Sequence, residues 1–426
     1  MKILWLTWKD KNHPRAGGAE VVNEELAKRL VRDGHEVKFL VAGYKDAMPE
    51  EIRDGFAVVR IGNRFSVYWR VYRYYKKHLQ EWPDLVIDEM NTIPFFAKFY
   101  AIKNEKSEEG SSMARSGGAG LGDVLNSTTE NHAGPRDNVR GERNRLSSSK
   151  QKNILFVHQL ARQIWFYEMP FPFSLIGYLV EPLYLWLLND RQAVTVSLST
   201  RRDLVRFGFK EEKVHIISEG IELEPVADLK SIQKFERPTI LALGAIRPMK
   251  RTHHIVRAFE LLRRTIPNAR LIIAGEPEGR YGKSVLAQAK SSIYARDIEC
   301  IGRVSPEKKR ELLGTCHFLL CTSVKEGWGL VVTEANSQGT PAVVYDVDGL
   351  RDSVKNAASF EAGGEVGGST GIITKKNTPA ALAQALAQLL VDESAYAAMQ
   401  KRGWEWSKEI TFDKSYRQFA EILKYV

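Results

Sequence analysis

Short apolar segments alternate with helical patterns twice along this chain of 426 residues, and no other feature limits its fold as strongly. Strands that alternate with helices predict parallel sheets covered by helices on both faces. We therefore expect an α/β fold made of two Rossmann-like, doubly wound parallel sheets. The expected strands cover residues 2–8, 36–42, 56–62, 84–88, 153–158 and 193–198 in the first half, and residues 239–244, 270–275, 298–302, 317–322, 342–346 and 371–374 in the second.

The length of the chain exceeds what a single hydrophobic core usually supports, so two domains are expected. We place an N-terminal domain at residues 1–222, a linker at 223–237, a C-terminal domain at 238–406 and a last helix at 407–426. Residues 104–152 break the first domain. They are rich in Ser, Gly, Asn, Arg and Glu and have little aliphatic periodicity, which predicts a disordered insertion.

The cysteines and the apolar segments indicate the cellular compartment in which the protein works. Cys300, Cys316 and Cys321 have no spacing typical of a metal site or a disulfide framework, so we interpret them as core residues in a reducing compartment. The first residues form a strand and are too short for a secretory signal. Because no segment offers about 20 uninterrupted apolar residues, no membrane span is predicted. A cytoplasmic location is expected.

The formal net charge of +10 favours anionic partners. The basic residues are scattered except in residues 64–82, and no DNA or RNA signature is present, so no nucleic-acid partner is expected. As a helix, this segment would turn Val67, Val71, Tyr75 and Leu79 to one side, next to basic residues. A basic, aromatic-rich helix suits an anionic membrane surface. A domain helix packed by its aromatic residues fits the pattern equally well.

A second aromatic stretch covers residues 164–188 and is interrupted by Pro170, Pro172 and Pro182. The prolines and two glutamates argue against a span. An acceptor pocket, an interfacial patch and simple core packing all remain open for this stretch. Together with the basic helix, it suggests peripheral contact with the inner face of the plasma membrane.

The strongest motif is Glu-Gly-Trp-Gly-Leu-Val-Val-Thr-Glu at residues 326–334. It follows a short apolar run that fits a buried parallel strand, and the carboxyl ends of such strands carry the ligands of open α/β sheets. Gly327 and Gly329 allow a tight turn, and the free amides at the start of a helix near Leu330 suit a diphosphate. Glu334, one to two turns later, can accept hydrogen bonds from ribose hydroxyls. For either glutamate alone, a helix cap with a solvated side chain is an equal alternative.

The motif and its setting resemble the retaining glycosyltransferases of family 4, also called glycosyl transferases group 1, whose signature is a Glu, seven residues and a second Glu. Glu326 and Glu334 have this spacing, and a second apolar strand follows at residues 342–345. The resemblance covers almost the whole chain. It implies the GT-B arrangement of two domains facing across a cleft, with the final helix crossing back to the first domain. It also implies a nucleoside diphosphate sugar, such as a UDP- or GDP-hexose, as donor, with no cofactor.

Family members share a Gly-Gly-x-Glu after the first strand, which this chain has as Gly17, Gly18 and Glu20. Amides at this helix start can reach a phosphate or the transferred sugar, and Glu20 is placed on the acceptor side. The Gly-x-Gly-x-x-Gly fingerprint is absent, which disfavours a nicotinamide cofactor. As a bare pair, these glycines would indicate only a turn.

The resemblance gives a catalytic role to His158, which ends a strand of the first half. It would hydrogen-bond the sugar and stabilise charge as the glycosidic bond breaks. A structural role is the alternative for a lone histidine. Asp88, Glu89 and Asn91 follow the preceding strand and are candidates for acceptor contact, with Asp88 and Asn91 assigned to that side.

In the second half, the family pattern after the first strand is Gly-Arg with a Lys five residues later, and the two cations neutralise the leaving diphosphate. Gly244 and Lys250 fit, but Ala245 replaces the Arg. We expect Arg247 to substitute, because a guanidinium can clamp phosphate oxygens from a shifted position. Gly275, after the next strand, and residues 346–349 are expected at the same rim, near the base or ribose, and ordinary loop positions fit both equally well.

These residues predict a retaining glycosyltransferase that moves a hexose from a nucleoside diphosphate sugar to a hydroxyl acceptor, a class that includes lipid-linked glycan and polysaccharide precursors of the cell envelope. No Asp-x-Asp pattern is evident, and no metal is expected. A nucleotide-sugar epimerase, a non-catalytic sugar-nucleotide-binding subunit and a basic nucleic-acid-binding protein are the alternatives.

Overall fold

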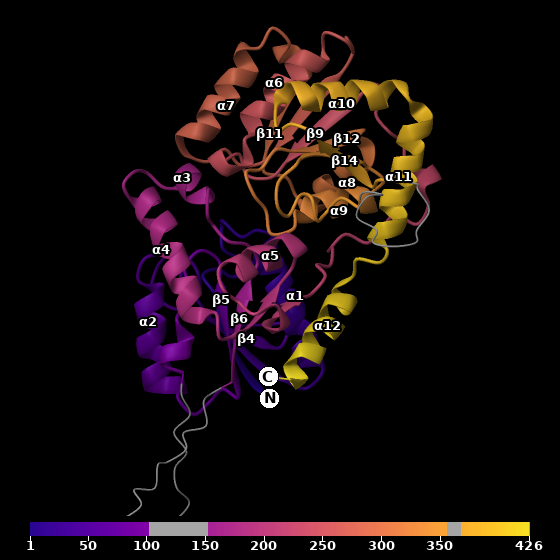
Figure 1. Ribbon diagram of the computed structural model, residues 1–426. Helices are drawn as coiled ribbons and strands as arrows, with labels where there is room; N and C mark the ends of the chain where they lie inside the picture. Colours follow the sequence, from indigo (N-terminus) through magenta and orange to yellow (C-terminus); the bar gives the residue numbers. More distant parts are fainter. Residues whose placement is uncertain (102–151, 356–367, 426) are drawn as a thin grey trace, which may run out of the picture.

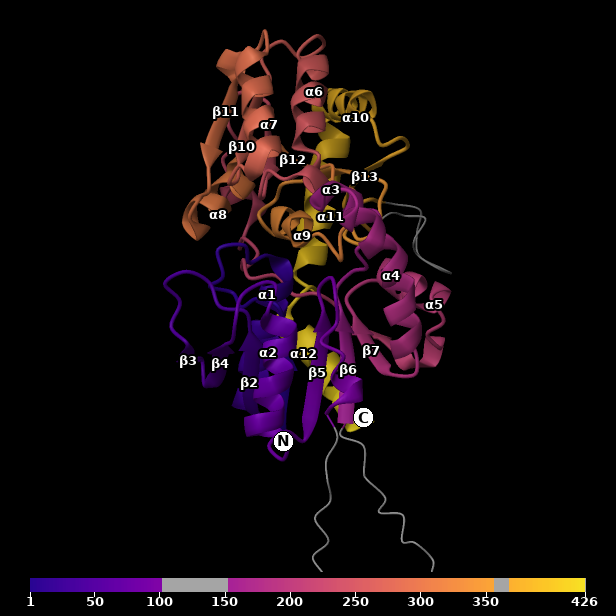
Figure 2. The same ribbon diagram turned by 90° about the vertical axis from the view of Figure 1, so that its left-hand side faces the viewer.

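The computed structural model describes residues 1–101, 152–355 and 368–425. The predicted disordered insertion therefore lies, apart from its last residue, outside the described residues. The described chain forms two lobes, each built around one sheet, and the last helix returns to the lobe that contains the N-terminus (Figures 1 and 2).

The first sheet has eight strands in the order β3-β4-β2-β1-β5-β6-β7-β8. All neighbours are parallel except β3 and β4, which are antiparallel. Sequence analysis missed β3, because two glutamates and an arginine occupy its four positions, and β8, because it has only three residues. The strands are β1 (Lys2–Leu6), β2 (Glu36–Val41), β3 (Glu50–Arg53), β4 (Phe56–Arg60), β5 (Leu85–Met90), β6 (Lys152–Val157), β7 (Gln192–Thr195) and β8 (Val214–Ile216).

The second sheet has six parallel strands in the order β11-β10-β9-β12-β13-β14. All six were predicted, because each is a short apolar run bounded by glycine or polar residues. The strands are β9 (Thr239–Leu243), β10 (Arg270–Ala274), β11 (Ile298–Gly302), β12 (Phe318–Cys321), β13 (Ala342–Tyr345) and β14 (Gly371–Thr374).

Helices cover both faces of the first sheet. α1 (Gly18–Arg32) packs on one face, and α2 (Val67–Tyr74), α4 (Phe173–Leu188) and α5 (Leu198–Arg206) pack on the other. α2 continues as one π-helical turn, and the expected apolar side is confirmed because Val67, Val71, Tyr75 and Leu79 are all buried. A short helix, α3 (Ile164–Glu168), leads into α4.

The second sheet is covered in the same way. α6 (Thr252–Leu262), α7 (Gly279–Ser291) and α10 (Pro379–Val391) share one apolar core with the sheet. α8 (Pro306–Thr315) and α9 (Leu330–Ser337) belong to the core of the opposite face. α11 (Glu393–Ser407) packs along α9 and leads toward the first lobe. The arrangement of two doubly wound parallel sheets is the predicted one.

The last helix, α12 (Phe412–Lys424), lies beside α1 in the first lobe (Figure 1). Its apolar side joins the core that α1 forms with the first sheet, where Phe419 is fully buried and packs against Trp5. Its polar side is fixed by an ion pair between Arg29 and Asp413, at 2.7 Å, and by a hydrogen bond from the Tyr416 hydroxyl to Asp33.

Candidate active site between the two sheets

Lys250 and Glu326 meet at the carboxyl ends of the strands of the second sheet. Lys250 ends a 3-10 turn, Pro248–Lys250, that follows β9, and Glu326 lies in the loop between β12 and α9. Lys250 Nζ donates to Glu326 Oε1 at 2.5 Å, and the Ser323 hydroxyl donates to the same oxygen at 2.5 Å. The structure thus brings into contact two residues that lie 76 positions apart.

Glu326 is held as an anion. Burial alone would raise its pKa, but the charge and hydrogen bond of Lys250, the hydrogen bond from Ser323 and the charge of Arg247 together lower the pKa below its ordinary value. The Lys250 side chain is 29% exposed, against 15% for Glu326. The ammonium group therefore has an open side on which an additional anion can bind.

Neighbouring loops hold Glu326 in place. Its backbone N–H donates to the Asp348 carbonyl at 3.0 Å, and Gly349, at φ +80°, passes so close that a Cβ there would lie 2.2 Å from the Glu326 carbonyl. The adjacent Lys325 is buried and forms ion pairs with Asp348, at 2.8 Å, and with Asp203 of α5 in the first half. Residues 346–349, expected near the base or ribose, brace the Glu326 loop in this structure.

Two arginines, Arg247 and Arg251, lie close to Lys250 in the sequence. The Arg251 side chain hydrogen-bonds to backbone carbonyl groups. Its Nε donates to the Thr322 carbonyl and its Nη2 to the Ser323 carbonyl, both at 2.6 Å. Its guanidinium also lies over the Tyr345 ring, 4.9 Å from the centroid. Arg251 therefore stiffens the end of β12 and has few donors left for a ligand.

Arg247 has more freedom. Its side chain is 36% exposed, and its nearest carboxylate is that of Glu168 in α3, 4.0 Å from Nε. Its charge contributes to the lowered pKa of Glu326, so it faces the same site. Ala245, at the family's arginine position, brings no charge to this rim. Of the two arginines, Arg247 thus has its guanidinium available beside Lys250. Its role at the diphosphate stays a prediction.

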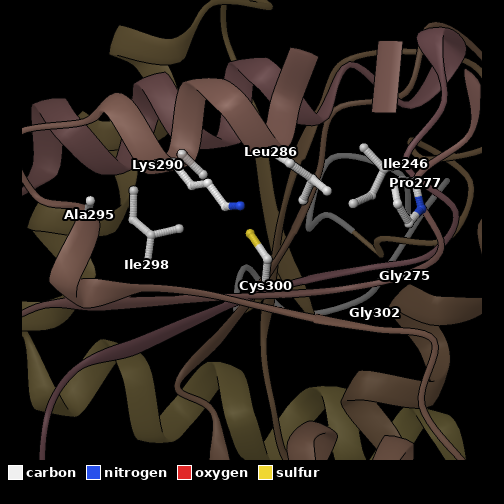
Figure 3. Close-up of a pocket in the computed structure, with 10 residues that line it drawn as sticks. Ile246, Gly275, Pro277, Leu286, Lys290, Ala295, Ile298, Cys300 and Gly302 are labelled. Carbon is white, nitrogen blue, oxygen red and sulfur yellow. The ribbon is translucent and has the colours of Figure 1, made fainter. Parts of the chain in front are cut away.

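Gly244 and Gly275 let two loops cross at the rim. Gly244 has φ +131°, and a Cβ on Gly275 would lie only 1.9 Å from the Gly244 carbonyl. A cavity of about 500 Å³ runs from Gly275 and Gly302 along β11 and beneath α7, and Lys290 and Cys300 point into it (Figure 3). Only its Ile246–Gly275 end approaches the site around Lys250.

The starts of two helices converge across the gap between the sheets. A Cβ on Gly18, at the start of α1, would lie 2.7 Å from Leu330 at the start of α9. A Cβ on Gly327 would lie 2.6 Å from the His158 carbonyl at the end of β6. Because helix N-termini carry partial positive charge and free N–H groups, this convergence produces a region suited to an anion.

Glu334 is buried one turn inside α9. It pairs with Lys309 of α8 at 2.6 Å. Burial raises its pKa, the Lys309 charge opposes that rise, and the charges of Glu219 and Glu222 add to it. Glu334 thus faces the junction of the two halves, next to acids of the first half, in the region where the predicted ribose contact would be made.

His158 lies in a buried cluster of polar residues in the first half. Its Nε2 is 3.2 Å from Asn23 Oδ1 and 3.9 Å from Glu89 Oε1. Its Nδ1 is 3.8 Å from Glu219 Oε1, and Asn23 donates to the other oxygen of Glu89. All four side chains are at least nine-tenths buried. The nitrogens of the ring therefore face carboxylates on both sides.

The cluster changes the protonation of its members. Burial alone would lower the pKa of His158, but the nearby carboxylates of Glu219, Glu89 and Glu20 outweigh burial and raise it. Burial raises the pKa of Glu89 to about 7, a shift that the His158 charge reduces and the Glu20 charge increases. Burial also raises the pKa of Glu219. The imidazole and the carboxylates of this cluster therefore shift one another's pKa, as coupled titrating groups do.

Glu20 borders this cluster at the start of α1. Its carboxylate accepts from the Gly17 N–H at 2.6 Å and pairs with Lys9 at 3.1 Å. The Asn91 side chain donates to it at 3.4 Å. The structure therefore brings three of the predicted residues, Gly17, Glu20 and Asn91, into one group.

Asp88 does not belong to this group. Its two oxygens accept the backbone N–H groups of Phe95 and Ala97, both at 2.8 Å, and burial raises its pKa to about 6. Successive side chains of a strand point to opposite faces, so Asp88 points away while Glu89 points toward His158. The acceptor-side assignment of Asp88 is replaced by a role in fixing the loop after β5.

Sequence reasoning missed the roles of Asn23, Lys325 and Glu219. Asn23 and Lys325 offered no local signal, because their partners come from distant segments. Glu219 did offer one. It precedes Gly220 shortly after an apolar strand, the same pattern that identified Glu326 and Gly327, but it lies just before the expected linker and was not singled out.

Comparisons with known proteins give the family. The sequence model described as Glycosyltransferase Family 4 matches residues 16–105, and the one described as Glycosyl transferases group 1 matches residues 228–406. The chain belongs to the family 4 glycosyltransferases. Within it, the chain is 29% identical over 248 residues to a D-inositol 3-phosphate glycosyltransferase of Kineococcus radiotolerans, covering 53% of this chain and 56% of the relative.

Alignments with the first curated relatives span between 39% and 56% of their lengths. Two solved structures share the fold. Sucrose-phosphate synthase from Thermosynechococcus elongatus is similar with a TM-score of 0.72 and 15% identity, covering 100% of this chain and 98% of that one. HepE from Anabaena, solved in complex with UDP-glucose, is similar with a TM-score of 0.64 and 15% identity over the full length of both chains. The predicted GT-B fold is confirmed.

Proposed function

We propose that this protein transfers a hexose from a nucleoside diphosphate sugar to a hydroxyl acceptor, with retention of the anomeric configuration. The observation that carries the proposal is the contact between Lys250 and Glu326 at the rim of the second sheet, opposite His158 of the first. A cation with an open side, two helix starts and a buried acid–imidazole cluster then surround one gap. The UDP-glucose held by HepE, which has the same fold, supports a donor of this class.

The leaving diphosphate is assigned to the second half. Lys250 exchanges its partner Glu326 for a phosphate oxygen, and Arg247 clamps from the opposite side of the turn. The N–H groups at the starts of α9 and α1, near Gly329, Leu330, Gly17 and Gly18, add partial positive charge. These groups supply the charge stabilisation for which other transferases use a divalent cation, so we propose a reaction without an essential metal.

The sugar and acceptor are assigned to the gap between the halves. Glu326, freed from Lys250, accepts hydrogen bonds from sugar hydroxyls, and Glu334 accepts those of the ribose. The base lies near Gly275. His158, held between two acids, stabilises positive charge that develops at the anomeric carbon and hydrogen-bonds the sugar. Glu20 and Asn91 face the incoming acceptor hydroxyl.

Donor binding and turnover test the proposal separately. In a thermal-shift screen of UDP-, GDP- and ADP-sugars, the true donor raises the melting temperature by mass action. The variants Glu326→Gln and Lys250→Met should lose at least 100-fold in transfer, roughly the effect of removing one stabilising group at a reacting centre. Lys308→Met, an exposed lysine on α8, is the control. Full turnover in either site variant would refute the assignment.

One alternative is favoured by a specific observation. Because Ala245 replaces the family's arginine, a non-catalytic subunit that binds sugar nucleotide is the second candidate. Such a subunit would give the thermal shift but release no nucleoside diphosphate with any acceptor. An epimerase, the other alternative, would convert the donor sugar in the absence of acceptor, which product analysis by NMR detects.

We also propose that the acceptor is lipid-linked and that the enzyme works at the cytoplasmic membrane face. The support comes from the apolar outer surface of α4, which lies in the acceptor-side half. Comparing transfer to a short-chain and a long-chain prenyl phosphate glycan tests this part, because a lipid-directed enzyme prefers the long chain in vesicles. Equal rates with both would contradict it.

A further inference from the structure

α4 presents an apolar face to solvent. Its single charged residue, Glu181, is fully buried and accepts hydrogen bonds from the Ala161 and Arg162 N–H groups and the Trp165 indole. A surface helix ordinarily turns polar residues outward, whereas α4 is apolar on its outer side as well as on the side that packs in the core. Its outward side chains, between 40% and 64% exposed, are Phe173, Leu175, Ile176, Leu179, Val180, Leu183 and Trp186.

This surface continues onto α2 through the loop of residues 91–100. The Tyr184 hydroxyl donates to the Thr92 carbonyl and Lys98 donates to the Leu187 carbonyl, both at 2.6 Å, so the loop is fixed to α4. On its other side the loop packs on α2, and both views place α2 and α4 on the same side of the first lobe (Figures 1 and 2). Four exposed rings extend the surface, and they are Phe65, Trp69, Tyr72 and Phe99. Together with the outward side chains of α4, they form the surface that is here called the α2–α4 face.

Positive charge borders the apolar part of the α2–α4 face. Arg70, Arg73, Lys76 and Lys77 are all exposed on α2 and its π-helical turn, and residues 67–79 contain no acidic residue. The Arg73 guanidinium lies over the Trp69 ring, 4.7 Å from its centroid. Cations beside exposed aromatic rings match an apolar layer that carries negative charge at its surface.

We propose that the α2–α4 face docks on an anionic lipid bilayer, with α4 lying in the plane of the interface. Among the described residues, no helix is long and apolar enough to cross a membrane, and α4 has only 16 residues. A second copy of the chain fits the face less well, because two such faces in contact would bring eight cations, four from each copy, close together. A bilayer covers the apolar side chains and also neutralises the cations.

The docked surface leads to the candidate active site. α3 precedes α4, exposes Phe166 and Tyr167, and touches the turn that carries Lys250, where the Met249 N–H lies 3.4 Å from Glu168. On the proposed transferase function, a hydroxyl anchored in the bilayer would thus enter beside Lys250. The surface provides a physical reason for a lipid-anchored acceptor, which the site residues alone do not.

Vesicle flotation tests the docking without any reaction. The full-length protein should float with phosphatidylcholine vesicles that contain 30% phosphatidylglycerol, and much less with phosphatidylcholine alone. Leu179→Glu/Leu183→Glu should abolish flotation, whereas Ile52→Glu/Ile293→Glu, at exposed apolar positions away from the face, should leave it unchanged. Arg73→Gln/Lys77→Gln should weaken partitioning roughly tenfold or more. Lys401→Gln/Lys424→Gln, on α11 and α12, is the charge-matched control.

Flotation on neutral and anionic vesicles alike, or unchanged flotation of the Leu179→Glu/Leu183→Glu variant, would overturn the proposal. So would a dimer that this variant dissociates, because a second copy would then be the occupant. The thermal shift by sugar nucleotides is measured on the same variants. If sugar nucleotides still raise the melting temperature while the wild-type protein fails to float, only the docking surface is refuted. If no sugar nucleotide raises the melting temperature of the wild-type protein, the transferase proposal is refuted instead.

Discussion

His158 and Glu219 face each other in the gap between the two sheets, with 3.8 Å between the imidazole Nδ1 and the carboxylate Oε1. They follow different strands of the first sheet, β6 and β8, and both are more than nine-tenths buried. The distance exceeds that of a hydrogen bond, so the carboxylate acts on the ring chiefly through its charge. Glu219 is therefore a positioning residue that favours the protonated imidazole.

The first prediction concerns this pair. Glu219→Gln keeps the shape but removes the charge, so burial counts for more and the pKa of His158 should fall. NMR titration of the His158 ring against pH measures the fall. Glu222→Gln, near the same junction but paired with Lys11, should leave the titration unchanged. A His158 pKa unaffected by Glu219→Gln would show that Glu219 does not set it.

The second prediction concerns Glu89 and stability. Its pKa is about 7 in the folded protein and 4.5 in an unfolded chain, so the folded state binds more protons between these values. The stabilisation that protonated Glu89 adds to the free energy of unfolding is complete below pH 4.5 and is lost as the pH rises through about 7. Glu89→Gln should remove on the order of 2 kcal/mol of this dependence. Urea denaturation from pH 5 to pH 8 measures the free energy of unfolding of the wild type and of Glu89→Gln. The same dependence of this free energy on pH in both proteins would contradict the prediction.

The third prediction concerns the displaced arginine. Arg247→Ala should weaken donor binding roughly tenfold to 100-fold, because a charge-assisted bidentate contact is lost, with little effect on stability. Adding Ala245→Arg should restore much of the binding, since it returns a guanidinium to the family position. Isothermal titration with the donor found in the screen measures both. Unchanged affinity in Arg247→Ala would remove Arg247 from the site.

The fourth prediction concerns the approach of the two halves. Gly327→Ala places a Cβ against the His158 carbonyl, so the halves must separate or the loop of Glu326 must shift. We expect kcat to fall at least tenfold, with a smaller effect on the melting temperature. Gly314→Ala in α8 is the matched control, because nothing lies within 4 Å of its new methyl group. Equal kcat in both variants would contradict the close approach.

The sequence predicted the fold well and the site in part. Apolar runs identified the second sheet completely, but β3 escaped because its charges are satisfied by tertiary contacts, such as Arg53 with Glu24 at 2.7 Å. Their positions after predicted strands, together with the family resemblance, placed Glu326 and Lys250 at one rim. These signals could not tell Asp88 from Glu89, because the face to which each points depends on strand alternation and neighbours that a local pattern does not contain.

α12 also makes the first lobe discontinuous in sequence. Phe412, Tyr416, Phe419, Ile422 and Leu423 complete a core whose other buried residues come from the first 217 positions. A fragment ending near residue 222 would therefore expose an apolar groove to water. We expect such a fragment to aggregate, even though it contains every strand of its sheet. Co-expression of that fragment with a peptide of residues 407–425 should restore a soluble lobe, so residues 407–425 must be kept in any attempt to divide this protein into its lobes.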